Sequence, residues 1–307
     1  MLNTEVISGL DRISPLLYDV DEAPAYAGPD RDHLIKLDRY KSIINTETGE
    51  PVAVVGKNYT FMTHEESLNI FSDAVKASGA TARVRDFSAS AMNTRLAVWV
   101  DFPDIKIPDL ESGEISLSLL FRNGIDGSSA LMLRFGAFRF VCLNMCVTGK
   151  KLLDTYMRHT SRIADRVENV AGQIQAALEG GRDALTESFS VFSGSFEHIT
   201  PALVVDYLVL VKRVPKKYVP SSPASNPWGL YNQFTDRITH RFQGSLETRA
   251  TYLEAVHRGI EHALRHPGVV VEETETRRAY YQAERDTSAV IDVTPQRIVD
   301  VSGCDVN

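Results

Sequence analysis

The sequence predicts an α+β protein: a helix, an antiparallel β meander and a long helix form the core, and a helical C-terminal region follows. Two patterns lead to this prediction. Between residues 40 and 145, apolar runs of strand length alternate with turn residues, whereas after residue 149 apolar residues recur at spacings of three and four. Apolar residues make up 43% of the 307 residues and charged residues 24%, a composition typical of soluble globular proteins.

Two strands and a helix are expected before the meander. Ser42–Ile44 and Pro51–Val55 flank a polar stretch that suits a hairpin turn. Thr63 is the expected N-cap of the helix, with Glu66 in the capping-box position, and Gly79 is expected to end it.

Four strands are expected to form the meander: Thr81–Ser88, Thr94–Phe102, Ile115–Arg122 and Ser128–Met145. The last of them is expected to split into a hairpin at Gly136-Ala137. The segment Pro103–Gly113 contains two prolines and is expected to be a loop.

A long helix is predicted from about Gly149 to about Glu179, because apolar residues mark one side of it at helical spacing. Basic residues cluster beside that side: Lys151, Arg158, Arg162 and Arg166. Further helices are expected at Asp183–Phe192, Pro201–Lys212, Asn226–Phe242 and Ser245–Leu264, with a loop over Pro215–Pro227.

These elements divide the chain into four parts. Residues 1–39 are acidic and rich in proline, which predicts a loosely ordered arm. Residues 40–180 form the α+β core and residues 181–266 the helical region. Residues 267–307 are charged and weakly periodic, so we expect an acidic tail with at most a short helix.

The charge is unevenly distributed along the chain. The net charge of −7 disfavours nucleic acid and anionic membranes on average, yet the segment from Ala130 to Val170 carries seven Lys/Arg and three Asp/Glu. Its basic residues are Arg134, Arg139, Lys150, Lys151, Arg158, Arg162 and Arg166. A second basic strip without an acid is formed by Lys212, Arg213, Lys216 and Lys217. An anionic partner is expected at these two clusters.

Aromatic and basic residues alternate within the first cluster, from Arg134 to Phe140. Phe135, Phe138 and Phe140 could stack on bases while the arginines hold phosphates. Phenylalanines of a meander also commonly form its core, and the basic residues could be a solvated surface paired with Asp154 and Asp165. Both interpretations stay open from the residues alone.

No pattern in the sequence points to an enzyme, a metal or a cofactor. Phosphate-binding loops, zinc-protease motifs and nucleophile elbows are absent. The three cysteines include Cys142 and Cys146, but no second ligand pair lies at zinc spacing, and so few cysteines indicate a reducing compartment. No apolar run reaches the length of a membrane span, and the N-terminus does not resemble a signal peptide, so we expect a cytoplasmic protein.

Several segments occur in an order that resembles a known family. They are Tyr59–Glu66, Leu119–Leu131, Arg139–Asn144, Arg158–Thr160 and Trp228–Thr235, followed by His240. This set resembles the phage/plasmid-like protein family, a domain of unknown function carried by phages, plasmids and integrative elements, over about residues 40–264. The motif residues that carry the resemblance are Asn123, Asp126, Gly127, Ser128, Asn144, His159, Trp228, Asn232, Thr235 and His240.

The order of elements is also similar to the core of single-strand annealing proteins of the RecT, Redβ and Erf type. Those proteins form rings or filaments and hold DNA along a basic groove beside the meander and the long helix. This similarity is one of fold, which by itself does not determine function. It implies that the basic residues of the first cluster line a similar groove here.

We therefore expect a non-enzymatic, ATP-independent protein of a mobile element that binds single-stranded DNA and acts in strand annealing or recombination. The expected partners are single-stranded DNA, further copies of the chain in a ring or filament, and recombination proteins of the host or the element. The alternative is a protein-interaction or anti-defence factor whose acidic surface has no nucleic-acid role. A nuclease whose carboxylates converge only in three dimensions is a third hypothesis.

Overall fold

The computed structural model describes residues 5–108, 110, 113–139, 145–146, 154–160 and 172–290. None of the helices in this part of the chain combines the length and the apolarity that a bilayer crossing requires.

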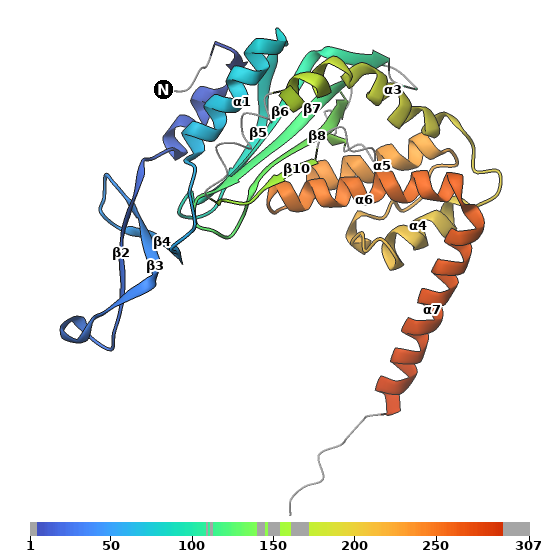
Figure 1. Ribbon diagram of the computed structural model, residues 1–307. Helices are drawn as coiled ribbons and strands as arrows, with labels where there is room; N and C mark the ends of the chain where they lie inside the picture. The colour runs from blue at the N-terminus through green and yellow to red at the C-terminus, as the bar shows by residue number, and fades with distance from the viewer. Residues whose placement is uncertain are drawn as a thin grey trace, which may run out of the picture.

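The centre of the molecule is a twisted sheet built around the meander (Figure 1). In spatial order its strands are β1 (Ile7–Ser8), β5 (Ala82–Ala89), β6 (Arg95–Pro108), β7 (Glu114–Gly124), β8 (Leu131–Arg139) and β10 (Asp154–Met157), and β9 (Met145–Cys146) also pairs with β8. Strand β1 runs parallel to β5, and the other described pairs are antiparallel.

One face of this sheet is apolar and carries the main core. Register partners in neighbouring strands share a face, which places Val98, Phe121 and Leu133 together here. Helix α1 (His64–Ser78) packs on them through Phe71, whose ring lies 6.2 Å from that of Phe121. The helical residues 172–179 and helix α3 (Gly181–Ser190) complete this layer.

The opposite face is crossed by helix α6 (Leu246–Arg265), which ion pairs tie to three strands. Arg122 of β7 approaches Glu247 at 3.7 Å, Arg134 of β8 contacts Glu254 at 2.8 Å, and Arg249 contacts Asp86 of β5 at 2.9 Å. The helical layers on the two sides of the sheet are visible in Figure 1, with α1 and α3 above the strands and α5 and α6 below them.

The helical region contributes an aromatic cluster that is continuous with the main core. Its elements are η4 (Val191–Ser193), α4 (Pro201–Leu210), η5 (Lys216–Tyr218) and α5 (Pro227–Arg241), together with α6. The rings of Phe189, Phe192, Trp228, Tyr231 and His257 pack with centroids 4.7–6.1 Å apart.

A separate three-stranded sheet projects from the body as an arm. It consists of β2 (Val20–Ala27), β3 (Ile35–Asn45) and β4 (Pro51–Gly56), with the short η3 (Arg31–His33) at its tip. A small cluster of Val20, Ile43, Val55 and Ile125 anchors its base on the body.

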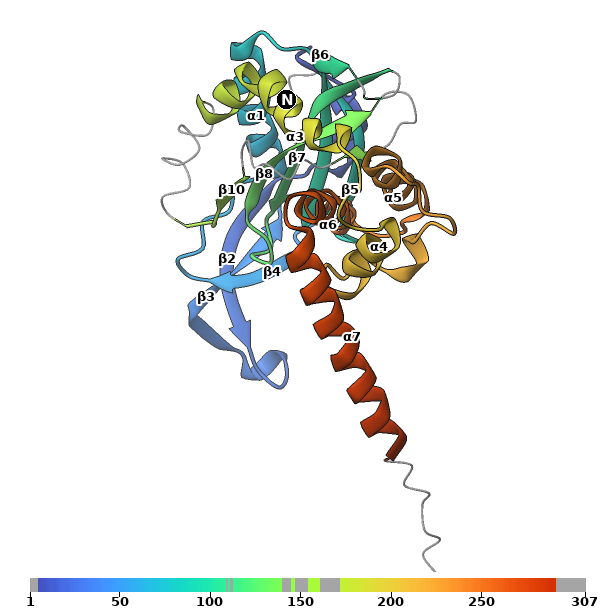
Figure 2. The same cartoon turned by 90° about the vertical axis from the view of Figure 1, so that its right-hand side faces the viewer.

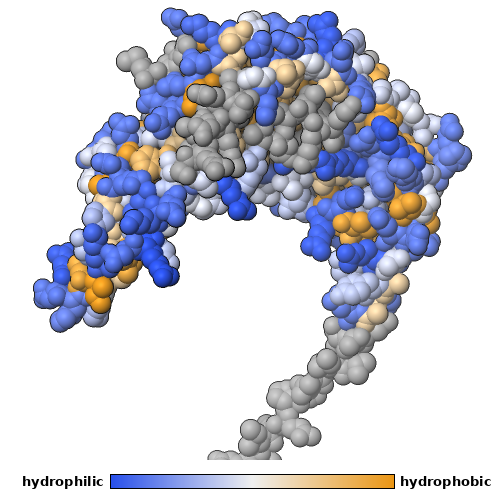
Figure 3. All heavy atoms as spheres, in the orientation of Figure 1, coloured by the Kyte–Doolittle hydropathy of each residue, from blue (hydrophilic) through white to orange (hydrophobic). Residues whose placement is uncertain are grey.

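Helix α7 (Pro267–Val290) is a second projection. It starts against α4 and α6, with Val270 buried, and then extends away from the body, as the two views in Figures 1 and 2 show. The arm and α7 leave the body on the same side, and Figure 3 shows the hollow between them.

The structure confirms the α+β class and most of the predicted elements. The antiparallel meander, the paired strands β3 and β4, and helices α3 to α6 lie where the sequence predicts them. Helix α1 has the predicted capping box, in which Thr63 and Glu66 cap each other's backbone, and Gly79 ends it with a φ of 68°.

Two predictions about the chain ends are wrong. Residues 5–39 are not a loose arm, because β1 pairs with β5, Leu10 and Ile13 enter the main core, and β2 belongs to the projecting sheet. Residues 267–290 are not a short or unstructured tail but one helix of 24 residues, α7.

Three predictions within the core are also wrong. The helix expected from Gly149 does not cover residues 154–157, which form strand β10 and pair with β8. Strand β8 continues through Gly136 and Ala137, which both pair with β7, so no hairpin forms there. Strand β6 extends beyond the expected loop boundary to Pro108, across a bulge after Phe102.

Candidate nucleic-acid interface

Arg134 and Phe135, the first basic and the first aromatic residue of the predicted DNA-binding cluster, lie inside the fold. Arg134 points under α6, where Glu254 is its partner, and Glu254 also pairs with Arg258 at 2.8 Å. Phe135 is only 2% exposed and lies 6.3 Å from the ring of Phe102, so it is a core residue and not a base-stacking one. A phenylalanine on the apolar face of a central strand has no route to a ligand.

Several other predicted residues fall beyond what the structure describes. The side chains of Phe138 and Arg139 at the end of β8 are among them. Phe140, Asn144, Lys150, Lys151, Arg162 and Arg166 lie outside the described residues altogether.

Arg158 is the described member of the basic cluster that reaches the surface. It is exposed and directly follows β10. Tyr156 precedes it by two residues and is 58% exposed. Tyr156 pairs with Met132, which pairs with Arg122, so Tyr156 shares the sheet face that α6 crosses.

The second basic strip lies on the helical region, around the end of α4 and η5. Lys212 places its ammonium 5.1 Å from the ring of Tyr207, and Lys217 does the same over Tyr218. Arg213 and Lys216 are exposed. The strip is therefore a surface feature of the helical region, whereas Arg158 follows strand β10 of the sheet.

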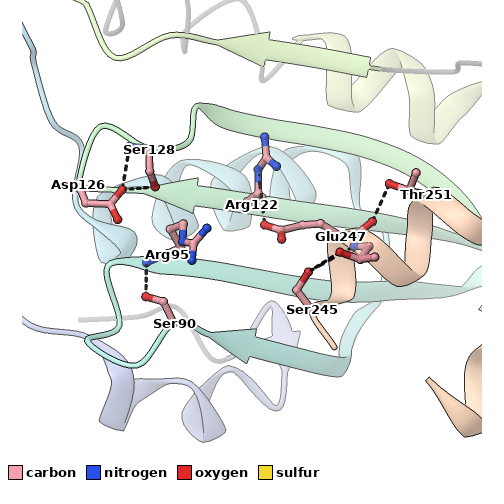
Figure 4. Close-up of polar contacts among 9 residues, drawn as sticks. Ser90, Arg95, Arg122, Asp126, Ser128, Ser245, Glu247 and Thr251 are labelled. Carbon is pink, nitrogen blue, oxygen red and sulfur yellow. Dashed lines mark hydrogen bonds and ion pairs between the residues drawn. The ribbon is translucent and has the colours of Figure 1, made fainter. Parts of the chain in front are cut away.

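A polar cleft opens on the α6 face, at the end of the sheet where the meander turns. Its volume is about 340 Å³, and it is lined by Ser88, Ser90, Arg95, Ser245 and Glu247 together with Ala89, Ala97 and Gly244. Figure 4 shows Arg95, Ser245 and Glu247 between the start of β6, strand β7 and the first turn of α6. The cleft combines hydroxyl groups, an exposed guanidinium and the Arg122–Glu247 pair, which suits a polar or anionic ligand.

Sequence reasoning missed Arg95. It is an isolated basic residue, outside both basic clusters, and only the fold brings it beside Ser245 and Glu247 of a helix 150 residues later in the chain. The signal that could have suggested it is its position at the first residue of a strand, next to a polar turn.

Three of the motif segments converge beside this cleft. The buried amide of Asn123 donates to the carbonyl of Met62 at 2.9 Å and lies 3.1 Å from Nδ1 of His64, whose Nε2 is 2.8 Å from the carbonyl of Asn93. The ring of His159, from the segment Arg158–Thr160, packs with its centroid 5.4 Å from that of Tyr59.

The turn after β7 is held by its own motif residues. The carboxylate of Asp126 accepts hydrogen bonds from the backbone of Ser128 at 2.9 Å and from the hydroxyl of Thr94 at 2.8 Å. Gly127 has a φ of 75°, which favours glycine, and its N–H donates to the hydroxyl of Tyr59 at 3.2 Å.

His64, Asn123, Asp126 and His159 form what we call the motif cluster, and both of its histidines are neutral at neutral pH. Burial lowers the pKa of His64 to about 4, and the carbonyl of Asn93 opposes this only in part. Burial also lowers the pKa of His159, and a hydrogen bond with the backbone of Thr60 and the charge of Asp126 oppose this only in part. Partial burial would raise the pKa of Asp126, but the hydrogen bonds from Ser128 and Thr94 outweigh it and lower the pKa. At neutral pH the cluster therefore carries one negative charge, on Asp126.

The contacts of Asn123 give the cluster a structural role, because they fix the linker before α1 to the end of β7. We expect Asn123→Ala to lower the free energy of unfolding by about 1–3 kcal/mol, because it removes the donor to the Met62 carbonyl and leaves that buried acceptor unpaired. Urea unfolding measures the change. Asn58→Ala, at an exposed position of the same linker, is the matched control and should stay within about 0.5 kcal/mol of the wild type. Equal stabilities of the two variants would contradict this role.

The C-terminal motif residues do not join this cluster. Trp228 and Thr235 are buried in the helical region, and Asn232 lies between them on α5. His240 is half-exposed near the end of that helix, 3.8 Å from Asp236. The positions of Trp228 and Thr235 indicate a role in packing the helical region.

No group of three or more potential metal ligands comes together among the described residues. Cys142 and Cys304 are not among those residues.

Comparison with known protein families gives a match over part of the chain. The model of a family described as a domain of unknown function, DUF932, matches residues 51–200. The matched segment runs from β4 to the residue before α4, so it contains the meander, the motif cluster and Arg158 but neither α6 nor α7. No curated protein and no solved structure matches the chain significantly.

Proposed function

We propose that the protein binds single-stranded DNA without catalysis or ATP, and that it acts in strand annealing or recombination for a phage or another mobile element. Its partners would be the DNA, further copies of the chain and recombination proteins in the cytoplasm. The proposal rests on two surface features that lie on one face of the sheet. One is the polar cleft with Arg95, and the other is the strand end with the exposed residues Tyr156 and Arg158.

The two features belong to the same row of the sheet. Ser88, Ala97, Arg122, Met132 and Tyr156 are successive register partners from β5 to β10. Four strand spacings of about 4.8 Å separate the ends of this row, or about 19 Å. One oligonucleotide can touch both ends, with phosphates at the two arginines and a base stacked on Tyr156.

The charge of the protein indicates that DNA would be held through a small number of contacts. The net charge of −7 opposes a polyanion, so affinity has to come from local arginines and should depend strongly on salt. A few phosphate contacts per chain also favour several copies acting along one strand.

The test is fluorescence anisotropy of a labelled single-stranded oligonucleotide at about 50 and about 200 mM salt, the range over which phosphate contacts weaken strongly. We expect salt-sensitive binding by the wild type. The double variant Arg95→Glu/Arg158→Glu should bind at least tenfold more weakly and lose about 1.4 from the slope of log affinity against log salt, about 0.7 for each lost contact.

A matched double variant controls for the change in net charge. Lys76→Glu/Arg182→Glu reverses two exposed charges on α1 and α3, which cover the other face of the sheet. It should bind like the wild type apart from a small uniform loss. Equal losses in both double variants, or no binding by the wild type at low salt, would refute the proposed interface.

A protein-interaction role is the second candidate, because the projecting arm exposes apolar side chains. A factor of that kind would show no binding to the oligonucleotide at either salt concentration. Cleavage of a labelled strand during incubation with Mg²⁺ would instead identify a nuclease.

A further inference from the structure

The polar cleft beside the start of α6 contains two opposite charges whose hydrogen-bonding capacity is largely unused. The guanidinium of Arg95 is exposed and makes no hydrogen bond or ion pair with any residue that the structure describes. The carboxylate of Glu247 has Nε of Arg122 as a charged neighbour, but at 3.7 Å, beyond hydrogen-bond distance. Figure 4 shows Glu247 extending from the first turn of α6 towards Arg122. The cleft therefore offers a ligand one strong donor and one strong acceptor.

The sheet beneath the cleft sets these groups in a line. Ser88, Ala97 and Arg122 are register partners on β5, β6 and β7, so their side chains share one face at spacings of about 4.8 Å. The hydroxyl of Ser88, at one end, forms no hydrogen bond with the described residues. Glu247 lies at the Arg122 end. A hydroxyl donor and a carboxylate acceptor thus stand on either side of Ala97.

The size and lining of the cleft suit a planar ring. Its volume of about 340 Å³ is at the lower end of the range for small-molecule sites, which fits one nucleotide unit better than a longer stretch of strand. Its apolar lining comes from Ala89, Ala97 and Gly244, so no apolar side chain longer than a methyl group fills it. Because no aromatic side chain lines the cleft, a ring bound there has to be recognised by hydrogen bonds to its edge.

Glu247 decides what kind of group can bind inside. A carboxylate only accepts hydrogen bonds, and it repels a phosphate. Arg95 is the group that suits a phosphate, because the nearby carboxylate of Asp126 already accepts hydrogen bonds from Ser128 and Thr94. A ligand that fits the whole cleft has a phosphate for Arg95 and N–H donors for Glu247.

We propose that the cleft binds a guanine nucleotide unit of the DNA strand. The N1–H and N2 amino groups of the base donate to the Glu247 carboxylate, its O6 accepts from the Ser88 hydroxyl, and Arg95 contacts the phosphate. Guanine is the DNA base with two adjacent N–H donors on its Watson–Crick edge, next to an acceptor. Adenine and cytosine have one amino group beside an acceptor nitrogen, and thymine has one N–H between two acceptors. An unpaired strand leaves this edge free to be read. The inference deepens the proposed function and rests on it.

The test compares three labelled strands in the anisotropy assay at about 50 mM salt, in which thymine alternates with guanine, hypoxanthine or cytosine. Hypoxanthine differs from guanine only in lacking the N2 amino group. We expect the wild type to bind the guanine strand about tenfold more tightly than either of the others, because a hydrogen bond to a charged group is lost with each of them.

The variant Glu247→Gln should still bind all three strands but lose the preference, because an amide presents one acceptor and one donor where guanine needs two acceptors. Glu261→Gln makes the same change on α6 outside the cleft, at a residue paired with Arg265, and should keep the tenfold preference. Equal binding of the three strands by the wild type, or a guanine preference that survives in Glu247→Gln, would overturn the inference and leave the proposed function intact.

Free nucleotides separate the two proposals if no strand binds. That result would refute the proposed function, and equilibrium dialysis against the 5′-monophosphates of deoxyguanosine and deoxyinosine would then decide the inference. Selective uptake of the guanine nucleotide by the wild type, lost in Glu247→Gln, would support a guanine site that serves a free nucleotide. Equal uptake of the two nucleotides, or no uptake of either, would refute the guanine site as well.

Discussion

Replacing Asp101 with alanine should lower the free energy of unfolding by about 3 kcal/mol, the lower end of the range for breaking a buried ion pair. Asp101 lies on β6 and has no exposed surface. Its two carboxylate oxygens each accept a hydrogen bond from Nε of Arg83 at 3.0 Å, and Nε of Arg85 lies 3.0 Å from one of them. Without the carboxylate, two neighbouring guanidinium groups remain side by side. They are partly exposed, and this access to water limits the penalty.

Urea unfolding at neutral pH measures this effect. Asp104→Ala removes a carboxylate of the same strand that is exposed, and it should change stability by no more than about 0.5 kcal/mol. A loss below about 1 kcal/mol in Asp101→Ala would show that the arginines find adequate compensation elsewhere, contrary to this prediction.

The second large effect is a loss of stability in acid that originates at His257. Its ring is completely buried in the aromatic cluster of the helical region, and burial lowers its pKa to about 3, with a smaller contribution from Arg258. Above pH 6.5 the histidine is neutral in both the folded and the unfolded state. Below pH 6.5 only the unfolded state takes up the proton, so stability falls as the pH drops towards 3, by about 1.4 kcal/mol per pH unit.

By pH 4.5 this single group should have cost about 2–3 kcal/mol, and His64, with a pKa of about 4, should add a similar amount. His257→Phe keeps an aromatic ring but loses the 3.3 Å contact with Ser188 and the titration. The measurement is the slope of unfolding free energy against pH between 6.5 and 4.5. That slope should be shallower in His257→Phe than in the wild type. Parallel slopes for the wild type and His257→Phe would contradict the prediction.

The elements that the sequence predicts correctly are those with local signals. Helix α1 begins at a capping box and ends at a glycine with positive φ, and both features are legible within a few residues. The strands of the meander are separated by turn residues. The hydrogen bond from the backbone of Ser128 to the carboxylate of Asp126 forms within the turn after β7 and is therefore local. The hydrogen bond from Thr94 to the same carboxylate comes from the neighbouring turn.

The errors occur where distant residues decide the structure. Tyr156 fits a helical apolar pattern, but residues 154–157 pair with β8 and form a strand of four residues, which is too short for periodicity to identify. Arg134 looks like a phosphate ligand until Glu254, 120 residues later, covers it. The beginning of α7 buries Val270 and Thr274, and the charged sequence that follows has no apolar stripe to announce a helix.

The two projections also affect how the mass of this protein has to be measured. A body with two projections, the three-stranded arm and a helix of 24 residues about 36 Å long, drags more solvent than a sphere of 34.1 kDa. Its Stokes radius is correspondingly large, and a single copy would leave a gel-filtration column early, at a volume calibrated for a heavier globular protein. From the elution volume alone, a monomer would thus be mistaken for a dimer. Truncating α7 after its buried first turns should delay the elution of a monomer by more than the lost mass accounts for.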